Sequence, residues 1–302
     1  MAAGSNRPGR HRAACRQGAG GFRRSLAVRS NRVVRSRRCL AVGLALLLAL
    51  VAAGGPARAA ALDPALHGSI RAVRTGEKAV ALTFDLCEGA GETAGYDAAL
   101  VGYLREHGIR ATFFAGGKWL KSHPEQARQL LNDPLFEVGS HAWSHGNLRQ
   151  LDGRARQEEI DRAEAVLAEL RRALPAAPPD PPLFRFPYGA CSAEALAEVN
   201  RRGLAAIQWD IVTGDPDRRQ DAAAIARTVL REIHPGAIVI AHANGRGWHT
   251  AAALPLFVPK LQALGYRFVT VGELLRLGDP LAVADCYERH PGDNRRYDRR
   301  GR

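Results

Sequence analysis

Five short stretches of the chain carry polar side chains that could support hydrolytic chemistry. In chain order they centre on Asp85, His141, Arg185, Asp210 and His242. The second stretch contains another histidine four residues further on, and two imidazoles at this spacing share one face of a helical turn, as metal ligands do. The spacing predicts a metal site.

Two of these stretches have a plainer alternative interpretation. The pair His141 and His145 could instead lie on the surface or in the core, but it follows a short apolar stretch, as Asp85 does, and this shared position favours a metal. Arg185 has the side chain best suited to orient a carboxylate through two parallel hydrogen bonds. His242 closes another apolar run, and alone it could be a core histidine with satisfied hydrogen bonds.

The elements that position these residues follow an alternating pattern. Short apolar stretches alternate with helical patterns from residue 78 onward, which predicts βαβ units and a parallel sheet. The strands are expected at 79–84, 111–114, 136–139, 183–186, 205–209, 237–241 and 267–270. The clearest helices are expected at 96–107, 125–131 and 154–173.

The number of these units predicts the architecture. About seven β/α units without a linker or repeat indicate an α/β fold, a (β/α) barrel of about seven strands in a single domain over about residues 70–278. In such a barrel the catalytic residues lie at the carboxyl ends of the strands. The polar stretches fall at these ends.

The charge distribution separates the amino-terminal region from the rest. The net charge is +13, but twelve of the 43 basic residues precede residue 60 and all 30 acidic residues follow it. The remaining chain is therefore almost neutral. This excludes a phosphate-binding surface and with it a nucleic-acid partner.

Residues 1–59 have the order of a signal peptide with a basic leader. Arginines precede an apolar run at 40–53, and an A-x-A pattern follows it at 57–59, so cleavage after Ala59 is expected. The run is short for a membrane span, although an uncleaved anchor is the alternative. Residues 36–40 resemble a twin-arginine export motif. We therefore expect an exported, periplasmic or secreted protein without a stable membrane span.

The other end of the chain and the cysteines give two further expectations. Residues 279–302 are polar, with five arginines among the last eight residues, and are expected to form a solvated tail. Cys87, Cys191 and Cys286 follow the leader. In an oxidising compartment they permit one disulfide and one free thiol, with three pairings open.

Taken in order, the five stretches resemble the motifs of the polysaccharide deacetylases, the chitooligosaccharide-deacetylase-like group of carbohydrate esterase family four. The resemblance covers about residues 78–278. A subgroup of the family has the sequence T-F-D-L-C-E in its first motif, as this chain has at 83–88. The motifs stand at 83–85, 141–145, 185–188, 209–215 and 240–242.

The resemblance implies a distorted (β/α) barrel that binds one divalent metal, usually zinc, and removes acetyl groups from N-acetylated sugars. It implies that His141 and His145 hold the metal and that Asp85 is the general base. Arg185 would orient Asp85, and the backbone N–H of Tyr188 would help to bind the oxyanion.

Two further roles follow from the last motif. The resemblance implies that His242 protonates the leaving amine and that Ile240 lines the pocket for the acetyl methyl group. An amine is a poor leaving group unless it is protonated, which is why the chemistry needs a separate acid.

The chain departs from the family pattern in three places. Leu86 stands where a second aspartate is usually the third metal ligand, and we expect Glu88 to bind instead, with Cys87 or a water as alternatives. Ala142 replaces a serine or threonine. The fourth motif lacks the full aspartate spacing, and Asp210 is the expected partner of Arg185.

The polar, glycine-rich run at 242–249 is a candidate sugar-binding loop. Trp248 could stack on a pyranose ring while Asn244 or Arg246 reaches sugar hydroxyls. The alternative is a turn that happens to contain a tryptophan.

The sequence therefore predicts an exported, metal-dependent hydrolase. Its substrate would be an N-acetylated or O-acetylated polysaccharide such as peptidoglycan, chitin-like oligomers or exopolysaccharide. Leu86 leaves open a carbohydrate-binding barrel that has lost its metal and its activity, and hydrolysis of a small amide is a third possibility.

Overall fold

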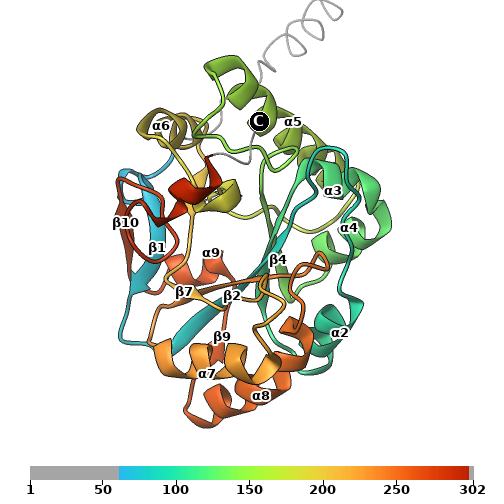
Figure 1. The fold of residues 1–302 in the computed structure, drawn as a ribbon, viewed down its shortest axis with the longest axis vertical. Coiled ribbons are helices and arrows are strands. Elements are labelled where there is room, and N and C mark those ends of the chain that lie inside the picture. The colour runs from blue at the N-terminus through green and yellow to red at the C-terminus, as the bar shows by residue number, and fades with distance from the viewer. Residues whose placement is uncertain (1–60, 299–302) are drawn as a thin grey trace, which may run out of the picture. The chain divides into compact units, whose positions relative to one another are not determined.

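The computed structural model describes residues 61–298. Strands in this part of the chain form one curled sheet (Figure 1). Their bounds are β1 Ser69–Arg74, β2 Ala79–Leu86, β3 Ala111–Ala115, β4 Phe136–Ser140, β5 Leu183–Phe184, β6 Ala205–Ile207, β7 Ile211–Val212, β8 Ile238–His242, β9 Arg267–Phe268 and β10 Asp279–Val283. Along the sheet their order is β10, β1, β6, β5, β4, β3, β2, β8 and β7, with β9 paired to β2.

Strand β2 lies within the sheet and is buried at every position. It pairs in parallel with β3 on one side and with β8 on the other. A strand covered on both faces has a continuous apolar sequence, which is why residues 79–84 predict a strand without any structural information.

The sheet closes through the short link between β6 and β7. Strand β6 pairs with β1 and β5, whereas β7 pairs with β8 at the other end of the strand order. Within the link, the Gln208 amide donates to Ile70 O (2.7 Å) and the Asp210 amide donates to Ile238 O (3.2 Å). Because three residues link β6, the third strand from one end of this order, to β7 at the other end, the sheet must curl. The predicted distorted barrel is confirmed.

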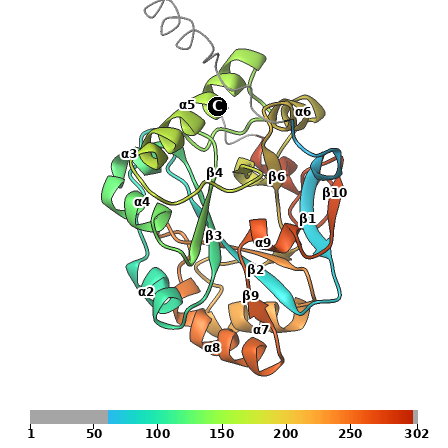
Figure 2. The same ribbon diagram turned by 180° about the vertical axis from the view of Figure 1, so that it is seen from behind.

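Most helices lie around the outside of the curled sheet, whereas α9 lies over its centre in this view (Figure 2). The α-helices are α2 Ala98–Glu106, α3 Gly117–Ser122, α4 Pro124–Leu131, α5 Gly153–Arg172, α6 Ala193–Arg201, α7 Ala222–Glu232, α8 Thr250–Ala263 and α9 Val271–Leu275. Helix α5 begins where the Asp152 side chain accepts from the Ala155 amide, and it buries Ile160, Ala163 and Leu167 on one face. The three- and four-residue apolar spacing of this segment predicts that face.

The carboxyl-terminal region differs from the expected solvated tail. Strand β10 pairs antiparallel with β1, and Cys286, three residues beyond β10, forms a disulfide with Cys191. The sequence analysis did not identify β1, which left β10 without a visible partner. The region from Asp279 to Asp298 is therefore part of the folded domain.

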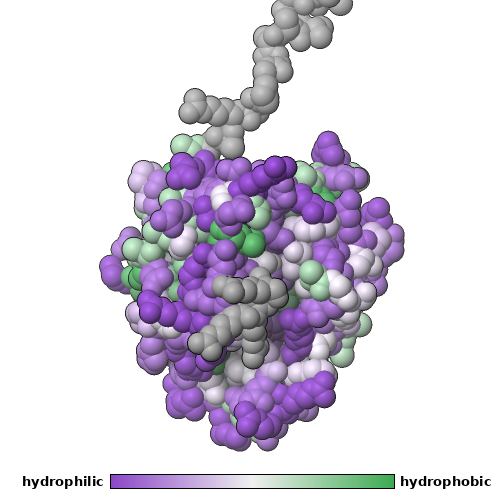
Figure 3. Space-filling model, turned by 45° about the horizontal axis from the view of Figure 1, so that its top comes forward, coloured by the Kyte–Doolittle hydropathy of each residue, from purple (hydrophilic) through white to green (hydrophobic). Residues whose placement is uncertain are grey.

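The surface of this domain is largely polar on the face drawn in Figure 3, where hydrophilic residues are interrupted by small apolar patches. Among the described residues, no helix combines the length and the apolar character needed to cross a membrane. The predicted signal peptide, its twin-arginine stretch and its cleavage position lie outside the described residues.

Candidate active site

Side chains from neighbouring parallel strands meet at the carboxyl edge of the barrel. Asp85 is the second-to-last residue of β2, and it is in register with His242, the last residue of β8. His141 follows β4 directly, and Arg185 follows β5. Because parallel strands end at the same edge, four polar residues far apart in sequence occupy one region.

Arg185 holds the carboxylate of Asp85. Its Nη1 donates to Asp85 Oδ1 at 2.9 Å, while its other nitrogens donate to the carbonyls of Ile207 and Gln208. The guanidinium is fully buried and lies 4.0 Å from the centre of the Phe114 ring. Burial alone raises the pKa of Asp85, but its electrostatic interactions with His141, Arg185 and His242 outweigh burial and hold that pKa below its ordinary value.

His141 presents one ring nitrogen to the site. Its Nδ1 lies 2.9 Å from the carbonyl oxygen of Arg185, and because a carbonyl can only accept, Nδ1 carries the proton. Its buried Nε2 has no hydrogen-bond partner within residues 61–298 and lies 3.5 Å from Asp85 Oδ2. Burial lowers the pKa of His141, so the ring is neutral and Nε2 has the free lone pair that a metal needs.

Two more donor atoms lie beside this nitrogen. Cys87, His141 and His145 each place one ligand atom within 4.8 Å of the other two. Burial also lowers the pKa of His145 well below its ordinary value, and burial raises the pKa of the Cys87 thiol to about 12. Two neutral imidazoles and a sulfur fit a zinc ion, whose charge would stabilise the thiolate, and they leave a fourth position open.

Glu88 is not the third donor that the sequence analysis expects. Its carboxylate accepts from the Ala94 amide at 3.1 Å and from the Ser122 hydroxyl at 2.8 Å. Side chains alternate between opposite sides of an extended chain, so Cys87 follows Asp85 toward the site while Glu88 points the other way. The Cys87 sulfur takes the place expected for Glu88.

His242 is bound to a carboxylate that the sequence analysis did not pair with it. Its Nδ1 lies 3.0 Å from Asp215 Oδ1, and its backbone amide donates to Asp215 Oδ2 at 2.7 Å. Asp215 is buried and also accepts from the Thr250 hydroxyl at 2.7 Å. Burial disfavours the charged form of His242, but the Asp215 carboxylate outweighs burial and raises the pKa of His242.

Asp210 does not contact Arg185, so the expected pairing is wrong. Asp210 Oδ2 lies 2.6 Å from His234 Nε2, and Oδ1 accepts from the Ile238 amide at 2.9 Å. Asp210 belongs to the link between β6 and β7, and its carboxylate accepts the hydrogen bond of the first backbone amide of β8. Asp215 lies beyond the left-handed Gly214, which turns the chain back toward the site.

The expected sugar-binding residues differ in their surroundings. Ile240 is buried two residues before His242 on β8, on the same side of the strand. Asn244 is also buried, and its amide nitrogen donates to the Cys87 carbonyl at 2.6 Å and lies 3.1 Å from the Cys87 sulfur. Asn244 therefore supports Cys87 rather than a sugar. Trp248 is 44% exposed and carries the Arg218 guanidinium 3.9 Å from its ring centre.

Backbone strain is concentrated at this edge. Within residues 61–298, the non-glycine residues with positive φ are Ala142 (60°), His145 (58°) and Tyr188 (60°). Such a residue costs about 1–3 kcal/mol and persists only where its surroundings hold it. The Tyr188 ring centre lies 4.4 Å from that of His145, so the strained positions are adjacent.

Comparison with known proteins identifies the family of this chain. A family model described as polysaccharide deacetylase matches residues 72–207. A chitooligosaccharide deacetylase of Bradyrhizobium is 30% identical over 213 residues, covering 66% of this chain and 92% of the relative. The chain belongs to the polysaccharide deacetylase family. The relatives named here as deacetylases make this a family of hydrolases that act on amide bonds.

Two other deacetylases are similar to this chain, one over part of a longer protein and one in its fold. The peptidoglycan-N-acetylglucosamine deacetylase PgdA of Listeria monocytogenes is 31% identical over 210 residues, which cover 70% of this chain and 41% of PgdA. The chain thus spans about two fifths of that relative. The crystal structure of the Bc1960 peptidoglycan N-acetylglucosamine deacetylase has the same fold, with a TM-score of 0.62 and 24% identity over 71% of this chain and 95% of the other.

Proposed function

We propose that this polysaccharide deacetylase homologue is a metal-dependent enzyme that removes acetyl groups from N-acetylated or O-acetylated polysaccharide outside the cytoplasm. Family membership supports the reaction class. One observation carries the proposal: the bare nitrogen of His141 converges with His145 and the Cys87 sulfur beside the Asp85 carboxylate. A water bound there would lie next to a base.

His141, His145 and Cys87 would hold one divalent metal. Zinc is favoured because imidazole and thiolate are its preferred ligands, and thiolate disfavours magnesium or calcium. When bound, the metal lowers the pKa of water toward neutrality and polarises the acetyl carbonyl.

Asp85 would take the proton from the attacking water. Its lowered pKa keeps it ionised at neutral pH, and the hydrogen bond from Arg185 Nη1 fixes one of its oxygens. The other oxygen lies 3.5 Å from His141 Nε2 and therefore faces the place where the water would lie. Base and nucleophile would thus be within hydrogen-bond reach before the substrate arrives.

His242 would give a proton to the departing sugar amine. A general acid must be protonated before it acts, and the Asp215 carboxylate favours that state by raising the pKa of His242. The backbone N–H of Tyr188 would donate to the oxyanion of the tetrahedral intermediate. Ile240 would border the acetyl methyl group.

The substrate class follows from the relatives and the surface. Both a peptidoglycan-N-acetylglucosamine deacetylase and a chitooligosaccharide deacetylase are similar to this chain. The exposed Trp248 offers an apolar face on which a pyranose could stack. We propose peptidoglycan or a related glycan as the substrate and the predicted signal as the means of export.

Zinc titration of metal-free protein tests this function. Acetate release is measured on N-acetylglucosamine oligomers and on peptidoglycan fragments, while bound zinc is measured by calorimetry on the same samples. We expect release to rise with zinc and to saturate at one equivalent. Zinc binding without release from either substrate contradicts the deacetylase. Absence of both zinc binding and release favours a carbohydrate-binding barrel instead.

A further inference from the structure

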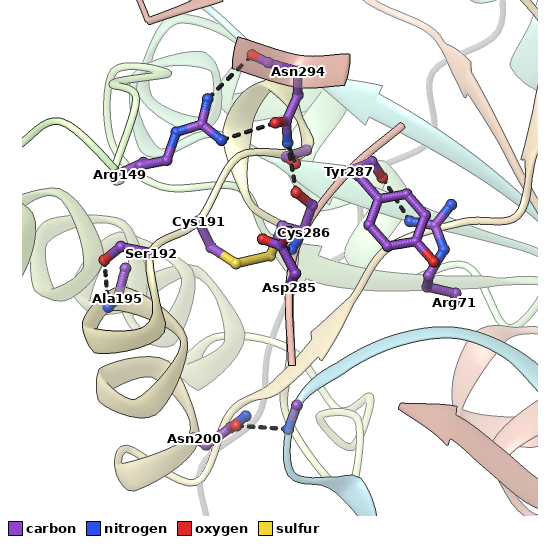
Figure 4. The surroundings of a disulfide bond; sticks show 12 residues. Arg71, Arg149, Cys191, Ser192, Ala195, Asn200, Asp285, Cys286, Tyr287 and Asn294 are labelled. Atoms are coloured by element: carbon purple, nitrogen blue, oxygen red, sulfur yellow. Dashed lines mark hydrogen bonds between the residues drawn. A yellow bond between two sulfur atoms is a disulfide. The ribbon is translucent and has the colours of Figure 1, made fainter. Parts of the chain in front are cut away.

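A segment that the proposed reaction does not use lies against the active site. Residues 284–298, called here the C-terminal strap, follow β10 and are fastened to the domain by the Cys191–Cys286 disulfide (Figure 4). Arg71 on β1 donates to the carbonyls of Tyr287 and Glu288, each at 2.6 Å. The strap is therefore anchored on the barrel before it reaches the active-site edge.

The strap contacts the turn that carries Tyr188. Asn294 is fully buried, and its amide nitrogen donates to the carbonyl of Gly189 and to that of Cys286. The Tyr297 ring stacks on the Tyr188 ring with 5.2 Å between their centres. The strap thus contacts the ring of Tyr188 and the carbonyl of Gly189, two consecutive residues with left-handed backbone conformations.

The same strap contacts the loop that follows His145. Arg149 donates to the side-chain oxygen of Asn294 at 2.8 Å and from its Nε to Asp298 at 2.9 Å. Asn147 also donates to Asp298, at 3.3 Å. The strap therefore joins the loop that follows His145 to the turn that carries Tyr188. Figure 4 shows Arg149 and Asn294 facing each other next to the disulfide.

We propose that the C-terminal strap completes the active site, with Asn294 and Tyr297 as positioning residues for Tyr188. The inference rests on the proposed function in one respect, the use of the Tyr188 N–H in the reaction. A left-handed tyrosine persists only while its surroundings hold it, and the strap supplies contacts to its ring and to the next carbonyl. Without them the turn relaxes, and an oxyanion donor displaced by a fraction of an ångström stabilises the transition state less.

Kinetics on four variants tests this role. We expect Asn294→Ala and Tyr297→Ala to lower kcat roughly tenfold to a hundredfold, while KM and zinc affinity stay within about twofold. Tyr297→Phe keeps the stacked ring and should retain most of the activity. Arg289→Ala is the matched control, because Arg289 lies on the strap but contacts Val212 and Glu232 instead. Its kcat should not change.

A second readout separates this inference from the proposed function. Hydrogen exchange at 187–190 reports the turn directly, since the amides of Gly189 and Ala190 donate within it. We expect faster exchange there in Asn294→Ala and Tyr297→Ala, but not in Arg289→Ala, even if the parent protein releases no acetate. Unchanged exchange in both alanine variants, or an equal loss of kcat in Arg289→Ala, would show that the strap only stabilises the fold.

Discussion

The histidines at the two sides of the active site have opposite electrostatic surroundings. His242 lies against the Asp215 carboxylate, which raises its pKa, whereas burial lowers the pKa of His141 and of His145. His141 bonds through Nδ1 to a neutral carbonyl and keeps Nε2 free. Both rings lie near a carboxylate, but only for His242 does the carboxylate outweigh burial, so His242 suits proton donation and His141 suits metal binding.

Removing one histidine from each side gives the largest contrast. His141→Ala should lose bound zinc and acetate release together, since it removes a ligand. His242→Ala should keep zinc but lose about 10²- to 10⁴-fold in kcat, the usual contribution of a general acid. Zinc content by atomic absorption, measured beside kcat, checks this. If both variants keep zinc, His141 is not a ligand.

Cys87 tests the metal side alone. Cobalt bound to a thiolate has a sulfur-to-metal charge-transfer band in the near ultraviolet, and we expect it in the cobalt-loaded parent but not in Cys87→Ser. Zinc affinity should fall at least tenfold in that variant, because even removal of an outer partner has such an effect. Cys87→Asp serves as the matched control that restores a ligand without sulfur. A parent spectrum without the band contradicts thiolate ligation.

Asp215→Asn tests the acid side. Loss of the carboxylate charge lowers the pKa of His242, so the ring loses its proton at lower pH and the alkaline limb of kcat against pH moves to lower pH. The acid limb, set by Asp85 with its lowered pKa, should stay in place. We expect roughly a tenfold loss of kcat near pH 8 and normal zinc content. A shift of the limb to higher pH would contradict the pairing.

The smallest effect is expected from a change at Trp248, which belongs to neither the His141 side nor the His242 side of the site. Trp248→Ala should raise KM for an oligomeric glycan roughly two- to tenfold and leave kcat and zinc content unchanged, because stacking on the exposed ring aids binding only. Trp248→Phe, which keeps an aromatic face, is the matched control. Steady-state kinetics with short and long oligomers measures the effect, and an equal KM in all three proteins would remove Trp248 from the substrate site.

The sequence predicted the barrel through its buried strands. Strands such as β2 are covered on both faces, so their apolar runs are continuous and readable without structural information. Strand β1 was missed because Arg71 interrupts its apolar residues. That arginine is buried only because Tyr287 and Glu288, more than two hundred residues later, offer it carbonyl oxygens. A contact at this separation leaves no local pattern.

The candidate site was less completely predictable for the same reason. Motif spacing identified Asp85, His141, His145 and His242, which the structure brings together, but not the partner of each. The choice between Cys87 and Glu88 depends on side-chain alternation at the end of β2, and this signal was present in the sequence. The Asp215 partner of His242 depends on a turn at Gly214, which spacing alone does not reveal.

The place where the strap ends affects how this protein can be joined to others. Asp298 accepts from Arg149 in the loop after His145. A fusion partner or affinity tag attached directly after Asp298 would therefore begin close to the loop that follows His145. A module attached at residue 60, directly after the predicted cleavage position, would leave the strap unaltered.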